Sequence, residues 1–278
     1  MSTASSAPEG RAEPALSPVP ETALWTLYYR AAEARRPDTV LRDPKAVELV
    51  DRHDFPFEAR FGPVKPALAR LQALRTAAFD REVADFLIRE PRGTVVCLGE
   101  GLETQYWRVD NGRARWLGVD LPEAVELRER LLPTGPRHRL LAASATDPGW
   151  LDEVDPAQGV LITAQGLLMY LRPEEVHALV ARCAARLPGA TFVFDALPHW
   201  FNRLSHAARP GEGGYQAPTM TWTIGSRALL ADPRTVPLTA RHGWFMRVLA
   251  LDLPDRRARL VRSLGPLDLR RPRRRPSG

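Results

Sequence analysis

Short apolar runs alternate with segments of helical pattern over the middle of the chain. The helical segments are expected at Leu102–Val109, Pro122–Leu132 and Pro173–Arg186. The apolar runs, four to six residues long, are Val95–Leu98, Trp116–Val119, Arg139–Ala142, Val160–Thr163, Thr191–Phe194 and Met246–Leu251. Runs of this length predict buried strands. Strands that alternate with helices predict an α/β fold with a mostly parallel sheet.

Helical spacing dominates the chain before these runs. Leu24, Leu27 and Tyr28 lie at positions i, i+3 and i+4, and a second short helix is expected after Asp43. A longer amphipathic helix is expected over Leu74–Ile88, with its large apolar side chains on one side. The N-terminal third is therefore predicted to form a helical cap.

These patterns divide the chain into four parts. Residues 1–20 contain almost no large apolar side chains, so a flexible arm is expected there. The helical cap covers 21–90, the α/β domain 91–255 and a basic tail 256–278. An insertion over 198–227 follows the C-terminal end of a predicted strand and is rich in His, Trp, Gly and Pro. Because ligands of open α/β sheets bind at such strand ends, the insertion is expected to be a lid or a substrate wall.

The net charge does not point to nucleic acid once its position is considered. The chain carries a formal charge of +6, but five arginines lie in the acid-free stretch 270–278. The rest of the chain is nearly neutral. A solvated tail explains the arginines better than a phosphate-binding surface does, so no nucleic-acid partner is expected.

The cysteine count and the hydropathy indicate the expected cellular location. Cys97 and Cys183 are too few for a disulfide framework or a metal site, which favours a reducing, cytoplasmic location and no metal. Neither a signal peptide nor a run of about eighteen apolar residues occurs, so no secretion and no membrane partner are expected. The oligomeric state stays open, with a homo-oligomer among the alternatives.

A two-glycine turn follows the first predicted strand. The apolar run Thr94–Leu98 leads into Gly99 and Gly101, where the backbone can approach a ligand that any Cβ would obstruct. Nineteen positions after Gly101, the second strand ends in Asp120. An acid there is placed to bind the hydroxyls of a ribose. The pattern predicts a nucleotide cofactor, with a simple strand-to-helix turn as the structural alternative.

The details of the turn favour one cofactor class over another. A dinucleotide fingerprint needs a third glycine, and Thr104 stands in its place. Glu100, between the two glycines, would repel a diphosphate. A nicotinamide oxidoreductase is therefore the minor alternative. S-adenosylmethionine has no phosphate, one ribose and a cationic amino-acid end, and it suits an acidic turn better.

Several motifs in order along the chain resemble the leucine carboxyl methyltransferase superfamily. The resemblance covers roughly Thr22 to Leu253 and is strongest to its bacterial branch of polyketide O-methyltransferases. The motifs are Thr22-Ala-Leu-Trp-Thr-Leu-Tyr-Tyr-Arg-Ala-Ala-Glu-Ala-Arg, Arg42-Asp-Pro-Lys-Ala46, Leu74-Arg-Thr-Ala-Ala-Phe-Asp80, Gly99-Glu-Gly-Leu-Glu-Thr104, Val119-Asp-Leu-Pro122 and Ala164-Gln-Gly-Leu-Leu-Met-Tyr-Leu171.

The resemblance implies a class I methyltransferase fold, with a seven-stranded Rossmann-like sheet, that binds S-adenosylmethionine. Arg75 would bind the methionine carboxylate, Asp120 the ribose, and Asp147 the adenine amino group. Asp147 precedes a proline, so capping of a turn is the structural alternative for it. The full set of residues expected around the cofactor is Arg75, Gly99, Glu100, Gly101, Asp120, Leu121, Thr146, Asp147, Gln165 and Gly166.

The chain departs from the family pattern at two positions. The glycine turn usually ends in Asp-Thr-Arg, but here it ends in Glu103-Thr104-Gln105. The motif after the fourth strand usually has Glu before Gly, and here that residue is Gln165. Each change removes an ionic group, so a protein that binds the cofactor without catalysis is an alternative.

The acceptor is expected to be a small aromatic or polyketide-type metabolite with a hydroxyl or carboxyl group. Such a product would belong to secondary metabolism, antibiotic biosynthesis included. N- and C-methylation use the same cofactor domain and stay open. Tyr170, His199 and His206 are candidates for catalytic contacts, since a phenol acceptor needs help in losing its proton. Tyr28, Trp200 and Trp222 are candidate apolar walls.

Overall fold

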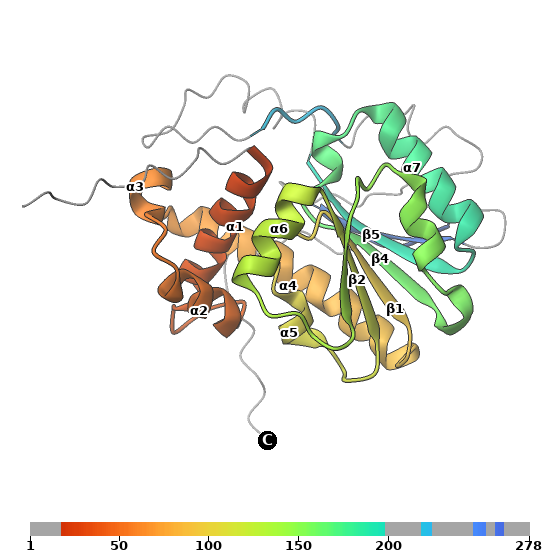
Figure 1. Ribbon diagram of the computed structural model, residues 1–278, viewed down its shortest axis with the longest axis horizontal. Coiled ribbons are helices and arrows are strands. Elements are labelled where there is room, and N and C mark those ends of the chain that lie inside the picture. Colours follow the sequence, from red (N-terminus) through yellow and green to blue (C-terminus); the bar gives the residue numbers. More distant parts are fainter. Residues whose placement is uncertain (1–17, 198–217, 224–246, 254–258, 264–278) are drawn as a thin grey trace, which may run out of the picture.

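Seven strands form one sheet in the order β3-β2-β1-β4-β5-β6-β7. The computed structural model describes residues 18–197, 218–223, 247–253 and 259–263 (Figure 1). The strands are β1 Thr94–Leu98, β2 Arg115–Asp120, β3 His138–Ala142, β4 Val160–Ala164, β5 Ala190–Ala196, β6 Arg247–Leu253 and β7 Arg259–Ser263. The first five are parallel, and β6 and β7 continue the sheet antiparallel to their neighbours. The mostly parallel α/β sheet is thus confirmed, with its parallel part made of five strands.

Helices surround the sheet and precede it. The α-helices are α1 Pro18–Ala34, α2 Pro44–Arg52, α3 Phe57–Phe61, α4 Pro66–Arg89, α5 Gln105–Val109, α6 Pro122–Leu131 and α7 Pro173–Arg186. Three short 3-10 helices are η1 Pro148–Glu153, η2 Pro156–Gln158 and η3 Leu168–Tyr170. Proline at the first turn opens α2, α4, α6 and α7, because its missing N–H has no partner to lose there.

Both faces of the central strands are buried, as expected of parallel strands. Phe79 and Val83 of α4 pack against Val95 and Leu161 on one face of the sheet. α7 and η1 cover the other face, and Figure 1 shows the sheet between α4 and α7. α4 therefore belongs both to the helical N-terminal part and to the α/β layer.

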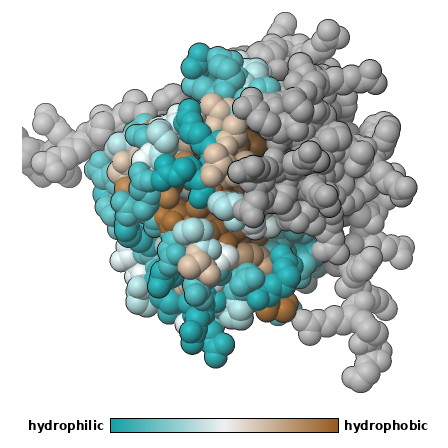
Figure 2. Space-filling view, turned by 90° about the vertical axis from the view of Figure 1, so that its right-hand side faces the viewer, coloured by the Kyte–Doolittle hydropathy of each residue, from teal (hydrophilic) through white to brown (hydrophobic). Residues whose placement is uncertain are grey.

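The N-terminal helices form a second, smaller core. Leu24, Leu27 and Ala31 of α1 pack against Leu49 of α2 and Phe57 of α3. The same cluster reaches the α/β part through Leu102, Leu127 and Leu132. No helix in the described part of the chain has the length and apolarity needed to cross a membrane. On the face shown in Figure 2, hydrophilic residues surround a smaller hydrophobic area.

Candidate functional site

Two glycine turns meet at the carboxyl ends of β1 and β4. Gly99, Gly101 and Gly166 have positive φ angles of 65°, 49° and 68°, which a side chain would strain. A Cβ on Gly99 would lie 3.2 Å from Cδ1 of Leu167, in the turn that follows β4. The two turns therefore approach each other across neighbouring strands, at the edge of the sheet where α/β proteins bind ligands.

Asp120 ends β2 and holds the first of these turns. Its Oδ2 accepts a hydrogen bond from the Gly101 N–H at 2.7 Å, and its Oδ1 accepts from the Leu121 N–H at 2.8 Å. Burial raises the pKa of this half-buried carboxyl, although the two backbone donors act in the opposite direction. Each oxygen can accept a further hydrogen bond, so the carboxylate can bind a ribose diol as well.

Arg75 lies behind the second turn, where α4 passes the ends of β4 and β5. Its side chain is buried, and its Nη1 lies 3.3 Å from Oδ2 of Asp195. Oδ1 of Asp195 accepts from the Gly166 N–H at 2.6 Å. The Nε of Arg75 has no hydrogen-bond partner among the described residues. A buried guanidinium with a donor to spare fits an anionic group such as the methionine carboxylate.

Asp195 belongs to the candidate site through Arg75 and Gly166, and it was not among the residues predicted from the sequence. It is fully buried at the end of β5, and burial raises its pKa against the opposing effect of Arg75. The available signal was an acid within the apolar strand Thr191-Phe-Val-Phe-Asp195-Ala196. A charged residue in a buried strand needs a partner, and that partner is Arg75.

The structure corrects the expectation for Glu100. This side chain is buried, with Oε1 at 2.9 Å from Nη2 of Arg128 and Oε2 at 3.0 Å from Nε2 of His138. It occupies the space beside Gly118 of β2, where a Cβ would collide with it. Its charge is balanced within the protein. Neither a side-chain contact to the cofactor nor repulsion of a diphosphate is therefore supported.

Two buried arginines hold the backbone of the glycine turn. Arg128 of α6 donates from Nη1 to the carbonyl oxygens of Gly101 at 2.7 Å and Glu103 at 2.8 Å. Arg30 of α1 donates from Nη2 to the carbonyl oxygen of Leu102 at 2.7 Å. Three consecutive carbonyl groups are thus fixed by two helices from different parts of the chain. Side chains of the protein itself thus hold the turn.

An ionic cluster joins the helical cap to this turn. We call it the cap network and define it as Arg30, Asp43, Asp80, Glu103 and Arg108. Arg108 contacts all three acids, with N–O distances of 2.8 Å to Asp43, 2.7 Å to Asp80 and 2.7 Å to Glu103. Arg30 lies 3.4 Å from Asp43 and 3.5 Å from Glu103. Burial alone would raise the pKa of Glu103, but Arg30 and Arg108 outweigh it and lower that pKa to about 2.

The two glutamines that depart from the family pattern both bind this network. Gln105 donates from Nε2 to Oδ1 of Asp80 at 2.9 Å. Gln165 donates from Nε2 to Oε2 of Glu103 at 3.0 Å and to Oγ1 of Thr76 at 3.1 Å. Neither side chain leaves a charged neighbour without a partner.

Thr146 and Asp147 lie in the loop after β3. Asp147 is exposed, and its Oδ1 accepts from the Gly149 N–H at 2.9 Å, so it caps η1. The carbonyl oxygen of Thr146 accepts from Nη1 of Arg182 at 2.6 Å. The capping alternative is therefore confirmed for Asp147, and a contact to adenine stays a prediction.

The candidates for acceptor contacts lie in different surroundings. Tyr170 of η3 is half-buried, and burial raises its pKa, so at neutral pH its hydroxyl is a hydrogen-bond donor rather than a base. Trp222 is 3% exposed, and its ring centroid lies 6.0 Å from that of Phe194, so it packs against the core, and its role as an apolar wall stays a prediction. Tyr28 stacks on Phe57 at 5.3 Å inside the helical cap. The remaining candidates, His199, Trp200 and His206, lie outside the described residues.

Part of the insertion can be placed. The N–H groups of Thr221 and Trp222 donate to the carbonyl oxygen of Met169 at 2.8 and 3.1 Å. The hydroxyl of Thr221 donates to the carbonyl oxygen of Leu171 at 2.7 Å. Residues 218–223 therefore lie along η3, next to the turn that follows β4.

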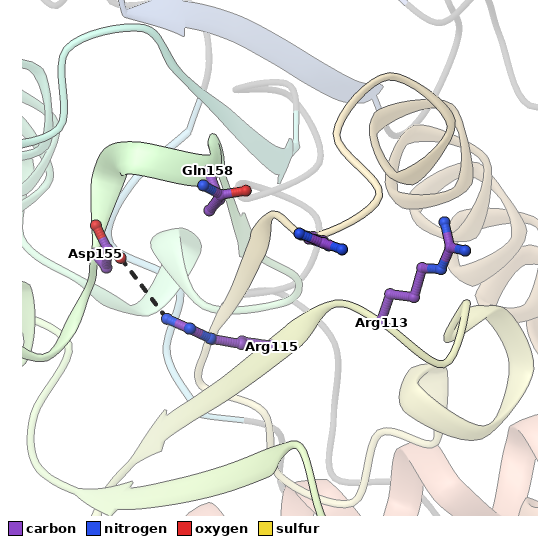
Figure 3. Close-up of a pocket in the computed structure, with 5 residues that line it drawn as sticks. Arg113, Arg115, Asp155 and Gln158 are labelled. Atoms are coloured by element: carbon purple, nitrogen blue, oxygen red, sulfur yellow. Dashed lines mark ion pairs between the residues drawn. The ribbon is translucent and has the colours of Figure 1, made fainter.

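A separate hollow of about 410 Å³ lies at the opposite edge of the sheet (Figure 3). It is lined by Arg92, Arg113, Arg115, Asp155 and Gln158, which flank or begin the amino ends of β1, β2 and β4. Arg115 lies 3.7 Å from Asp155, as Figure 3 marks. Because α/β sheets bind ligands at their carboxyl ends, this hollow is not the expected cofactor site. Among the described residues, no group of His, Cys, Asp and Glu is arranged to hold a metal ion.

Comparison with known proteins shows the family to which the chain belongs. The family model for leucine carboxyl methyltransferase matches residues 23–184. The tetracenomycin polyketide synthesis O-methyltransferase TcmP of Streptomyces glaucescens is 33% identical over 235 residues, which cover 83% of this chain and 84% of that protein. The S-adenosyl-L-methionine-dependent methyltransferase dpfgK of Gibberella zeae is 28% identical over 176 residues, covering 58% of this chain and 59% of that protein.

Among solved structures, the magnesium protoporphyrin IX methyltransferase of Synechocystis PCC 6803 with bound SAH is 15% identical, with a TM-score of 0.42. The match covers 73% of this chain and 92% of that one. The family model spans more than half of the chain and includes both glycine turns. The chain is an S-adenosylmethionine-dependent methyltransferase and belongs to the leucine carboxyl methyltransferase family.

Proposed function

We propose that the protein transfers the methyl group of S-adenosylmethionine to a hydroxyl or carboxyl oxygen of a small aromatic or polyketide-type metabolite. The observation that carries this proposal is the 33% identity, over 83% of the chain, to a polyketide O-methyltransferase. The five parallel strands and the glycine turn after β1 fit a class I cofactor domain.

The geometry supports specific roles around the cofactor. The spare donor of Arg75 binds the methionine carboxylate, and the free lone pairs of Asp120 bind the ribose. Gly99, Gly101 and Gly166 allow the backbone to approach the methionine part closely. The loop that contains Thr146 and Asp147 lies beyond β3 and flanks the adenine, and Leu121 lies beside the ribose.

Methyl transfer is an in-line displacement, in which an oxygen lone pair forms the O–CH₃ bond while the S–CH₃ bond breaks. Alignment and exclusion of water supply much of the acceleration. A carboxylate acceptor needs no base, whereas a phenol must lose its proton. Because Tyr170 stays protonated, it orients the acceptor as a donor, and His199 or His206 accepts the phenol proton.

The test is formation of S-adenosylhomocysteine with a panel of phenols, aromatic carboxylic acids, amines and activated carbon acceptors. We expect turnover with the oxygen acceptors. Turnover with amines or carbon acceptors alone would contradict O-methylation. Binding of S-adenosylmethionine with no turnover on any acceptor would favour a non-catalytic binding protein.

The two histidines allow a sharper version of this experiment. Replacing both His199 and His206 with Ala should lower the rate on a phenol by about 100-fold, the usual contribution of general-base catalysis. The rate on a carboxylate acceptor should change little. Equal losses on both acceptors would contradict the role of these residues as bases.

A further inference from the structure

Gln165 is oriented by the chemistry of its neighbours. Its side-chain nitrogen lies 3.0 Å from a carboxylate oxygen of Glu103 and 3.1 Å from the hydroxyl of Thr76. A carboxylate can only accept hydrogen bonds, so the NH₂ group of the amide, and not its oxygen, must face Glu103. Only one of the two amide orientations satisfies this contact.

Glu103 is held as a carboxylate by several donors at once. Arg108 contacts Oε1 at 2.7 Å, the Thr104 N–H donates to the same oxygen at 2.8 Å, and Nη1 of Arg30 lies 3.5 Å from Oε2. The lowered pKa of Glu103 agrees with these contacts. The amide of Gln165 therefore meets a charged group at any pH at which the protein works.

The cap network has no unpaired positive charge that could balance a further negative charge beside Glu103. It contains three acids and two arginines, and its two arginines already share contacts among those acids. The family pattern has acids at both of these positions together with an arginine at position 105, but this chain has Gln105 there. Without that cation, a carboxylate at position 165 would place two anions in direct contact beside the turn after β1. Such a pair cannot remain fully ionised without opening or taking up a proton.

We propose that Glu103 and Gln165 act as one coupled pair, in which Glu103 supplies the charge and Gln165 is the positioning residue that holds the turn after β4 for S-adenosylmethionine. In this pair the carboxylate, Glu103, lies in the turn after β1, and the amide, Gln165, lies in the turn after β4. Position 165 therefore requires an amide, because an ionised glutamate there could not donate a hydrogen bond to Glu103. This inference rests on the proposed placement of the cofactor between the two turns.

The test measures binding of S-adenosylmethionine by calorimetry, without any acceptor. The variants are Gln165→Glu, Glu103→Gln, the double variant that combines them, and the matched control Gln158→Glu. Gln158 is exposed at the opposite edge of the sheet. We expect Gln165→Glu to weaken binding by about 10-fold at pH 8 and to recover toward pH 6, where the two carboxyls share a proton. The double variant should bind within about 3-fold of the parent, because the amide at position 103 can donate to the carboxylate at position 165 and so re-form the hydrogen bond in the opposite direction. The control should bind as the parent does.

Two results would overturn the proposal. One is unchanged affinity of Gln165→Glu at every pH, and the other is a double variant whose loss equals the sum of the two single losses. If Gln165→Glu does not fold, Gln165→Ala takes its place in the test. Gln165→Ala should lose less affinity for S-adenosylmethionine, and this loss should be the same at pH 6 and pH 8. A pH-dependent loss in Gln165→Ala would also contradict the proposal. Because no acceptor is present, an error in the proposed acceptor class leaves these results unaffected.

Discussion

Asp120 illustrates how one residue can serve both the fold and the ligand. Its two oxygens fix the glycine turn and the start of α6 through backbone N–H groups. Because it remains half-buried rather than enclosed, it can still be reached from the ligand side. The same carboxylate thus sets the shape of the turn and the polarity of the surface that the ribose meets.

Replacing Asp120 with Ala should weaken S-adenosylmethionine binding by about 10- to 100-fold, since hydrogen bonds to a charged group contribute roughly 1.5–3 kcal/mol. Calorimetric titration measures this loss. Asp155→Ala removes an exposed acid that caps η2 at the other edge of the sheet and is the control. Unchanged affinity in Asp120→Ala would contradict the assignment.

At the scale of elements, the glycine turn depends on the two helices that flank it. α1 and α6 each contribute one buried arginine to its carbonyl oxygens. Glu100, which lies against Gly118 of β2, balances the charge of Arg128. The glycine turn, α6 and β2 are therefore connected through this ion pair. Loss of either partner leaves the other as an unpaired buried charge.

Arg128→Met should lower the free energy of unfolding by about 3–5 kcal/mol, the usual cost of breaking a buried ion pair. Adding Glu100→Gln should restore part of that loss, because the orphaned carboxylate is removed. Urea unfolding followed by fluorescence measures both variants. If the double variant is no more stable than Arg128→Met alone, Glu100 is not the compensating partner.

The sequence predicted some elements well and others poorly, for physical reasons. The five parallel strands are marked by apolar runs, and each was predicted within about two residues of its observed bounds. α4 begins at Pro66 and not at Leu74. Part of this early segment is held by a contact distant in sequence, the ion pair between Arg70 and Glu33 of α1, which a local apolar pattern does not show. The helix predicted from Leu102 begins only at Gln105, since the preceding residues form the turn that Arg30 and Arg128 hold.

At the scale of the whole molecule, the cap network connects segments far apart in the sequence. Asp43 begins α2, Asp80 lies in α4, and Glu103 lies in the glycine turn, yet all three contact Arg108. Local patterns predicted the glycines and Asp120, whose roles follow from their own strand ends. They could not predict Asp43 or Arg108, whose partners are set by how the cap packs on the α/β domain.

The pH dependence of stability should reveal this network. The pKa of Glu103 is lowered to about 2 from an ordinary value of 4.5, so its contribution is complete above pH 4.5 and is lost as the pH falls toward 2. The contribution is on the order of 3 kcal/mol. Urea unfolding between pH 7 and 3 should show a shallower decline for Glu103→Gln than for the parent. Parallel declines would contradict the lowered pKa.

The way the insertion is anchored has a consequence for how the enzyme can diversify. Leu197, directly after β5, and Met220, two residues after the described chain resumes, pack in one small cluster with Met169 and Tyr170. The described residues on either side of 198–217 thus lie close together. Doubling the length of such a segment costs only about 0.6 kcal/mol in loop-closure entropy. We therefore expect that this connection can change in length without disturbing the sheet, because its two flanking positions stay fixed against η3.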